Sequence, residues 1–285
     1  MRSDRVLPRR ALLAEVTATL SAAGVSEPRR EALRLWSALR GGSGDDVFLE
    51  GEAEVEPGSA DSLRNAVRRR AAGEPLDHVA GWTGFRTLRL RSDRRALIPR
   101  PETEGLVDLL LARVRTGQVA DIGTGSGCLA LSLAAEGGFS RVWGVDLSAE
   151  ALAQAEENRV ALASPVHLIR GDLCGPLRPG SLDAVVSNPP YLTGEEYAGL
   201  DPSVKRWEPA AALVSGPDGL YATRRLLHEA RDVLRPGGWL ALEVDCTRAA
   251  IVAAEANALG WMDVAIHADL FGRERYLLAR RSAES

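Results

Sequence analysis

The sequence predicts an α/β fold: a small helical domain, then a β-hairpin, then a parallel, doubly wound sheet. After residue 102, short apolar runs typical of strands alternate with helical segments of about 10 to 15 residues. Before residue 72, apolar residues recur at intervals of three and four, which indicates helices. We therefore expect a helical domain over residues 1–75, a linker with the hairpin over 76–100 and the α/β domain over 101–285.

Composition excludes several classes of protein. Of the 285 residues, 45% are hydrophobic and 26% are charged, which is typical of globular proteins and not of disordered, collagen-like or coiled-coil chains. A formal net charge of -4 argues against a protein that holds duplex DNA mainly by neutralising phosphates. The three cysteines show neither a disulfide framework nor a metal-binding spacing. We expect a cytoplasmic monomer without a membrane span, a metal ion or stably bound nucleic acid.

The amino-terminal helices are indicated by apolar residues that share one face. These are Leu12, Leu13, Val16 and Leu20, then Leu33, Leu35, Trp36 and Leu39, then Leu63 and Val67. Gly24 and an acidic segment rich in turn formers, residues 41–61, separate them. Alternating apolar residues between 81 and 99 then predict the hairpin.

The larger domain follows a strand-helix alternation. Strands are expected at residues 119–123, 142–147, 166–173, 182–191, 239–245, 262–267 and 275–279. Helices are expected at residues 128–136, 148–162, 226–234 and 248–259. Strands that are separated by helices of this length form βαβ units and pair in parallel.

A glycine-rich loop follows the first of these strands and consists of Gly123, Thr124, Gly125, Ser126 and Gly127. Glycines let backbone N–H groups approach a ligand closely, and the start of the next helix favours an anionic group. At the end of the second strand, 19 residues beyond the loop, the carboxylate of Asp146 is placed to accept hydrogen bonds from two ribose hydroxyls. The pattern predicts a site for a nucleotide-like cofactor.

The loop spacing favours S-adenosylmethionine over NAD as that cofactor. Dinucleotide sites favour GxGxxG, whereas this loop is GxGxG and follows the acidic Asp121. A negative charge at this position suits a ligand with an ammonium group better than a diphosphate. At the end of the third strand, we expect Asp172 to hydrogen-bond the adenine amino group and Leu173 to pack on the adenine ring.

The reaction site is predicted at Asn188, Pro189, Pro190 and Tyr191, which end the fourth strand. The two prolines remove N–H donors, so the carbonyls around them are presented as acceptors. Together with the Asn188 side-chain oxygen, they can receive both N–H bonds of a planar NH2 group while Tyr191 stacks on its face. Because a conjugated nitrogen is a weak nucleophile, orientation must supply much of the catalysis. Methyl transfer fits this demand, with Asn188, Pro189 and Tyr191 as the catalytic residues.

The chain resembles the HemK-like release factor glutamine methyltransferases over nearly all of residues 70–281. The shared motifs are DIGTGSG, SNPPY, IPRPETE at residues 98–104, Glu208-Pro209 and the closing DLFGR. The resemblance implies a Rossmann-like methyltransferase domain that depends on S-adenosylmethionine. It also implies N5-methylation of the glutamine in the Gly-Gly-Gln motif of class 1 peptide release factors, with S-adenosylmethionine as methyl donor. It implies that Gly123 to Gly127, Asp146, Leu173 and Asn188 contact the cofactor and that residues 188–191 hold the amide. The helical domain would recognise the partner.

Other functions are weighed against this one. Adenine-N6 methyltransferases of nucleic acids and ribosomal-protein glutamine methyltransferases share the NPPY motif, but IPRPETE resembles the release factor branch. An adenine methyltransferase would also be expected to have a basic target-recognition domain, and the 12 arginines and 11 acidic residues before Ala72 indicate no such surface. An NAD-dependent oxidoreductase is disfavoured by the loop spacing, and a non-catalytic binding module would be expected to lose the glycines or NPPY. The role of the arginine-rich segment 86–100 stays open, although Arg100 between two prolines suggests a fixed role.

Overall fold

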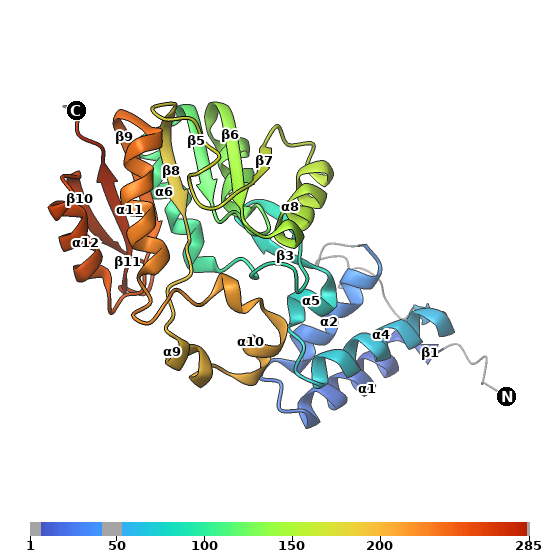
Figure 1. Cartoon of the computed structure of the whole chain (residues 1–285). Coiled ribbons are helices and arrows are strands. Elements are labelled where there is room, and N and C mark those ends of the chain that lie inside the picture. Colours follow the sequence, from blue (N-terminus) through green and yellow to red (C-terminus); the bar gives the residue numbers. More distant parts are fainter. Residues whose placement is uncertain (1–6, 42–52, 284–285) are drawn as a thin grey trace. The chain divides into compact units, whose positions relative to one another are not determined.

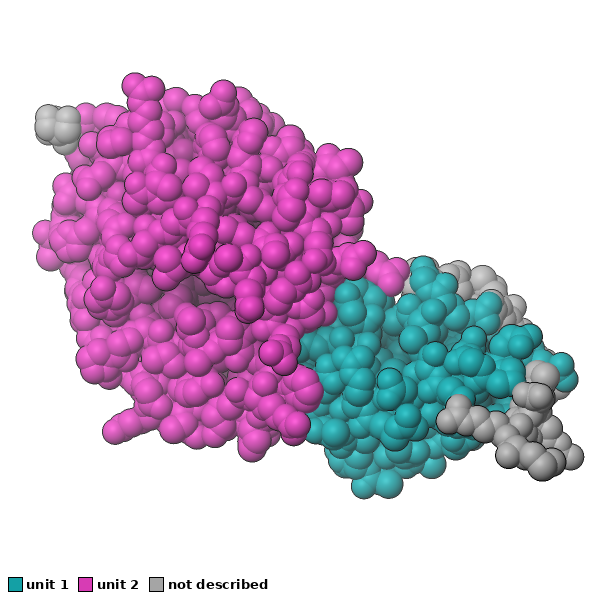
Figure 2. All heavy atoms as spheres, turned by 45° about the vertical axis from the view of Figure 1, so that its right-hand side comes forward, with its two compact units in different colours: residues 1–83 teal, residues 84–285 magenta. Residues whose placement is uncertain are grey.

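The computed structural model describes residues 7–41 and 53–283. The chain folds into two compact units, Met1–Thr83 and Gly84–Ser285, which Figure 2 shows in different colours. The boundary between them falls within the segment that the sequence predicts as the linker. Most of the predicted acidic segment, residues 42–52, lies outside the described residues.

The first unit is built from helices, labelled in Figure 1. They are α1 (Arg9–Ala22), α2 (Pro28–Leu39), α4 (Pro57–Ala71) and α5 (Leu76–Ala80), with a short antiparallel pair of strands, β1 (Leu7–Pro8) and β2 (Glu54–Val55). Proline occupies the first turn of α2 and of α4, where its missing N–H costs nothing. The predicted apolar faces form the core of this unit, except that Leu39, at the end of α2, is 47% exposed.

The second unit contains a seven-stranded sheet. Its strands are β5 (Thr116–Ile122), β6 (Gly138–Asp146), β7 (His167–Arg170), β8 (Leu182–Ser187), β9 (Leu234–Glu243), β10 (Met262–Ala268) and β11 (Glu274–Arg280), in the order β10-β11-β9-β8-β5-β6-β7. Strands β5 to β9 pair in parallel, as predicted. The prediction is wrong for β11, which is antiparallel to both neighbours, because residues 269–273 are too few for a crossover to a parallel strand.

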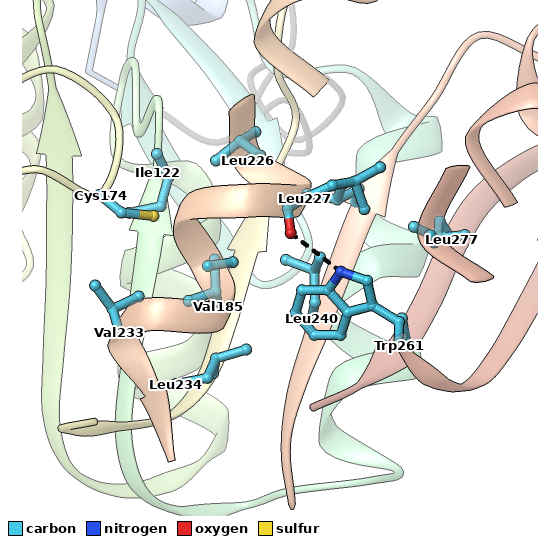
Figure 3. Packing of buried hydrophobic residues seen from close by; sticks show 14 of the residues in the cluster. Ile122, Cys174, Val185, Leu226, Leu227, Val233, Leu234, Leu240, Trp261 and Leu277 are labelled. Atoms are coloured by element: carbon cyan, nitrogen blue, oxygen red, sulfur yellow. Dashed lines mark hydrogen bonds between the residues drawn. The ribbon is translucent and has the colours of Figure 1, made fainter. Parts of the chain in front are cut away.

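Helices cover both faces of the sheet (Figure 1). One core lies under α11 (Tyr221–Val233) and α12 (Ala249–Ala258), where the indole N–H of Trp261 donates to the carbonyl of Leu227 at 3.0 Å (Figure 3). The other core lies under α6 (Glu104–Leu111) and α7 (Cys128–Glu136), and α8 (Ala149–Ala161) follows β6. Alternate residues of each strand supply the two cores, since successive side chains of a strand point to opposite faces.

Several short elements were not expected from the sequence. The 3-10 turn η1 (Pro101–Thr103) leads into α6, and α9 (Gly194–Gly199), α10 (Pro202–Trp207) and η2 (Ala210–Ala212) follow β8. Helices α9 and α10 bury none of their residues, so they carry no apolar periodicity to reveal them. The expected hairpin consists of β3 (Trp82–Phe85) and β4 (Leu88–Arg91). Within the two described ranges, no helix is both long and apolar enough to cross a membrane.

The sheet topology locates a ligand crevice. Strand β5 has β6 on one side and β8 on the other, so the strand order reverses at β5. In open α/β sheets, ligands bind beyond the carboxyl ends of the strands at such a switch point. The loop after β5, the carboxylate that ends β6 and the NPPY segment after β8 all lie at this edge.

Candidate active site

A cavity of about 490 Å³ lies at this edge within the second unit. Among the predicted site residues, those that line it are Gly123, Thr124, Gly125, Ser126, Asp146, Asp172, Leu173, Asn188 and Pro190. The structure therefore brings together residues from the ends of four strands. Asp121, Gly127, Pro189 and Tyr191 lie behind or beside this wall and do not line the cavity.

The glycine loop is fixed by the neighbouring strand. The backbone N–H groups of Gly123 and Thr124 donate to the carbonyl of Val145 at 2.8 and 2.9 Å. Gly127 has a φ of 86° in the left-handed region, and a Cβ there would lie 3.1 Å from Leu131 Cδ1. Both the backbone conformation and the close packing of α7 therefore favour glycine at this position.

Asp121 supports the loop from below instead of facing the cavity. Its side chain is fully buried, and its Oδ2 accepts hydrogen bonds from Thr124 Oγ1 at 2.6 Å and from the N–H of Ala130 at 3.1 Å. Burial raises the pKa of Asp121 to about 7, against the lowering effect of these two hydrogen bonds. Its Oδ1 is buried with no partner among the described residues. The carboxyl group thus couples the loop to the first turn of α7.

Asp146 binds the loop and also lines the cavity. Its Oδ2 accepts from the N–H of Gly125, and its Oδ1 accepts from the N–H of Ser148, both at 2.8 Å. Partial burial raises the pKa of Asp146 against the lowering effect of these backbone donors. With each oxygen held by one donor, remaining lone pairs can still accept from a ligand.

Asp172 and Leu173 stand at the mouth of the cavity. Asp172 is exposed, and its Oδ2 accepts from Arg225 Nη1 on α11 at 2.8 Å. Leu173 has a φ of 44°, a conformation that non-glycine residues rarely adopt, and its side chain packs against the core under α11. The structure thus places both residues where the sequence predicted, with Asp172 held by a cation.

The NPPY segment is anchored on both sides. Asn188 Nδ2 donates to Thr103 Oγ1 at 3.0 Å, and the Thr103 hydroxyl donates to Glu243 Oε2 at 2.7 Å. The N–H groups of Tyr191 and Leu192 donate to the carbonyl of Leu213 at 3.2 and 2.9 Å. Burial raises the pKa of the half-buried Tyr191 to about 12, so its phenol stays neutral near pH 7. The segment is therefore held in one conformation before any ligand arrives.

Several residues at the cavity were not identified from the sequence. Thr103 and the 63% exposed Leu147 line the cavity, and Glu243 accepts a hydrogen bond from Thr103. Arg100, for which the sequence suggested a fixed role, lines the cavity and donates to Glu208 at 2.8 Å. Glu243 could have been found from the sequence, because it is an acidic residue at the carboxyl end of the apolar strand β9. Asp121 has a similar place near the end of β5. Leu147 directly follows Asp146, so the sequence also shows an apolar residue next to the predicted ribose-binding carboxylate.

Comparisons with known proteins decide the family. The family model described as the PrmC N-terminal domain matches residues 11–81, and that of the methyltransferase small domain matches residues 101–200. The release factor glutamine methyltransferase of Deinococcus radiodurans is 42% identical over 96% of this chain and 98% of its own length. The protein of that name from Moorella thermoacetica is 40% identical over 96% and 99%. The chain belongs to the release factor glutamine methyltransferase family.

The family confirms the predicted resemblance and the predicted methyltransferase class. Among solved structures, a methyltransferase from Pyrococcus furiosus superposes with a TM-score of 0.53 at 22% identity, over 70% of this chain and 91% of that one. This likeness confirms the predicted Rossmann-like fold. The IPRPETE segment of this chain places both Arg100 and Thr103 at the cavity.

Proposed function

We propose that the protein transfers the methyl group of S-adenosylmethionine to the side-chain amide nitrogen (N5) of the glutamine in the Gly-Gly-Gln motif of class 1 peptide release factors. One observation carries this proposal: the amide-accepting Asn188 and the glycine loop with Asp146 line the same cavity. A donor held by the loop and an amide held by NPPY would therefore meet within one pocket. The names of the relatives support the same substrate.

The residues at the loop fit S-adenosylmethionine. A Cβ added at Gly123 would meet no atom within 4 Å, so the backbone on the cavity side is open to close approach by a ligand. We assign Asp146 to the ribose hydroxyls and Leu147 with Leu173 to the faces of the adenine, with Asp172 at its amino group. Burying an exposed leucine side chain against an aromatic ring contributes favourable free energy to binding. Asp121 would act through the loop and not by direct contact with the ammonium group.

The chain's own residues orient the amide. S-Adenosylmethionine supplies an electrophilic methyl group on a positively charged sulfur. Asn188, which lines the cavity, would accept one N–H of the glutamine amide at its Oδ1. The carbonyl of Pro189, the next residue in the chain, would accept the other, and Tyr191 would flank the amide plane once the substrate extends past the cavity wall. Held in this way, the nitrogen presents its π face to the methyl carbon. The N–CH3 bond would form as the S–CH3 bond breaks, with S-adenosylhomocysteine as the leaving group, and the nitrogen would then release one proton to solvent.

We also propose that residues 1–75 recognise the release factor and that the enzyme acts as a monomer. The match of the amino-terminal family model to residues 11–81 supports a distinct role for this unit. No stable nucleic-acid binding is expected, in line with the net charge of -4.

The test is transfer of radiolabelled methyl from S-adenosylmethionine to a purified class 1 release factor. Its variant with alanine in place of the Gly-Gly-Gln glutamine and a duplex DNA serve as controls. We expect label on the wild-type factor alone. Label on DNA would move the substrate from an amide to a base, and absence of label on the wild-type factor would refute the proposal.

A further inference from the structure

Behind Asn188 lies a chain of hydrogen bonds that the amide-holding reaction does not itself require. It runs from Asn188 Nδ2 to Thr103 Oγ1 at 3.0 Å and from the Thr103 hydroxyl to Glu243 Oε2 at 2.7 Å. Glu243 is 1% exposed and Thr103 is 2% exposed, so both groups are nearly excluded from bulk water although Thr103 lines the cavity. The chain connects β9, η1 and the end of β8.

The number of protons shared by Asn188, Thr103 and Glu243 decides which way the Asn188 amide points. A threonine hydroxyl has one proton, and here that proton is donated to the carboxylate of Glu243. Thr103 Oγ1 can therefore only accept from Asn188, and the donor that reaches it is Nδ2. Nδ2 turned toward Thr103 leaves Oδ1 as the acceptor on the cavity side, which is the atom needed for a substrate N–H.

We propose that Thr103 and Glu243 are positioning residues that set the Asn188 side-chain amide with its oxygen toward the substrate. This inference rests on the proposed function. It explains why a carboxylate is buried at the end of β9 and why a threonine follows the arginine-proline-glutamate element. Neither residue touches the substrate amide in this account, and both act through Asn188.

The surroundings of Thr103 keep it in place. The Tyr276 hydroxyl of β11 donates to the carbonyl of Glu102, the residue before Thr103. A Cβ added at Gly105 would lie 2.6 Å from that same hydroxyl, so the start of α6 packs directly on Tyr276. The position of the Thr103 hydroxyl is therefore fixed by β11 as well as by its own turn.

The protonation state of Glu243 controls which groups donate and which accept in this series of hydrogen bonds. Burial raises the pKa of Glu243 to about 7, against the lowering effects of the Thr103 hydrogen bond and of Arg275 at 3.8 Å. Once protonated, Glu243 can donate to Thr103, whose own proton is then free to meet Asn188 Oδ1, and the amide can turn over. The ionised form is the one that presents Oδ1 to the substrate.

Other charged and titratable groups surround Glu243, namely Arg100, Glu102, Cys128, Tyr191, Arg275 with its partner Asp269, and Tyr276. Burial raises the pKa of both tyrosines to about 12 and that of the Cys128 thiol still further. These three groups stay neutral near pH 7.

The first experiment compares Thr103→Val, Thr103→Ser and wild type, by calorimetry with S-adenosylmethionine and by single-turnover methyl transfer to the release factor. Valine keeps the branched shape and removes the hydroxyl. We expect Thr103→Val to slow transfer by roughly tenfold or more with unchanged S-adenosylmethionine affinity, and Thr103→Ser to restore most of the rate. Thr223→Val is the matched control, because Thr223 is also a buried threonine but lies on α11, and this variant should keep the wild-type rate.

The second experiment measures the single-turnover rate of wild type and Glu243→Gln between pH 6 and 8.5. We expect the wild-type rate to rise as the pH passes through about 7. This rising limb of the pH profile should disappear in Glu243→Gln, because the glutamine oxygen can still accept from Thr103 but does not titrate. Asp121, whose pKa is also about 7, remains in the variant, so a limb that persists would be attributed to it and would overturn the inference.

The outcomes separate the two proposals. Wild-type protein that labels no release factor refutes the proposed function, and the inference with it. Active wild type with Thr103→Val within twofold of its rate, or with Thr103→Ser as slow as Thr103→Val, refutes the inference alone.

Discussion

Two buried carboxylates support the two halves of the site in different ways. Asp121 on β5 and Glu243 on β9 point to the sheet face covered by α6 and α7, and each accepts a hydrogen bond from a threonine hydroxyl. Thr124 is part of the glycine loop, so its hydrogen bond to Asp121 fixes the backbone of that loop. Thr103 instead carries the effect of Glu243 to the side chain of Asn188. One carboxylate therefore shapes a binding loop, whereas the other orients a functional group.

Their electrostatic surroundings differ as well. Asp121 has only neutral donors, with Asp146 as the nearby charge that raises its pKa further, whereas Glu243 has Arg275 at 3.8 Å. Burial is nevertheless the leading cause of the raised pKa in both. A similar pair of hydroxyl and carboxylate thus supports binding or positions a side chain, depending on whether the threonine belongs to the glycine loop or contacts Asn188.

The largest effect is expected when the amide half is broken directly. Asn188→Ala removes the acceptor for the substrate N–H, and loss of one such oriented group costs about 10² to 10³ in rate. We expect this loss in single-turnover transfer at saturating S-adenosylmethionine. Asn257→Ala on the exposed face of α12 is the control and should behave as wild type. Near wild-type activity of Asn188→Ala would rule out the proposed amide clamp.

The cofactor half should respond differently to the corresponding change. Thr124→Val removes the hydroxyl that donates to Asp121 and leaves the buried carboxylate with only the N–H of Ala130 on Oδ2. We expect the S-adenosylmethionine dissociation constant to rise about tenfold, the equivalent of one buried hydrogen bond, with the rate at saturation nearly unchanged. Calorimetry measures the first and single-turnover transfer the second, with Thr124→Ser as the restoring control. A slowed chemical step with unchanged affinity would show that the two halves do not act separately.

Stability should report the burial of Glu243 independently of activity. Its pKa of about 7 in the folded protein lies above the ordinary value of 4.5, so the folded state binds this proton more tightly than the unfolded state. The stabilisation is complete below about pH 4.5 and is lost as the pH rises through 7. We expect the melting temperature of wild type to fall relative to Glu243→Gln between pH 5 and 8, by roughly 2 to 4 °C or more. Parallel pH profiles for the two proteins would contradict the raised pKa.

The smallest effect is expected at the mouth of the cavity. Arg225→Gln removes an exposed ion pair with Asp172, and such pairs contribute little because solvent screens them. We expect the KM for S-adenosylmethionine to rise by about two- to fourfold at most. Arg235→Gln breaks a similar exposed pair with Asp183 away from the cavity and should leave this KM unchanged. A tenfold effect of Arg225→Gln would place Asp172 among the principal cofactor contacts.

The parts of this protein that depend on local chemistry could be predicted from the residue types. Periodicity located every strand of the large sheet, because a buried strand must be apolar whatever surrounds it. The glycine loop and NPPY were recognisable since their backbone demands, left-handed φ at Gly127 and missing donors at the prolines, are written in the residue types. Asp146 followed from its place at the end of the second strand.

Which distant residues meet depends on how the whole unit packs. Asn188 and Thr103 are 85 positions apart, and Thr103 and Glu243 are 140 apart, so no local pattern joins them. The reversal of β11 was also beyond periodicity, since a strand has the same alternation in either direction. Asp121 proved to lie under the loop because the pleat of β5 turns it toward α7. Spatial partners, strand direction and burial are set by packing of the whole unit, which the order of residue types alone does not specify.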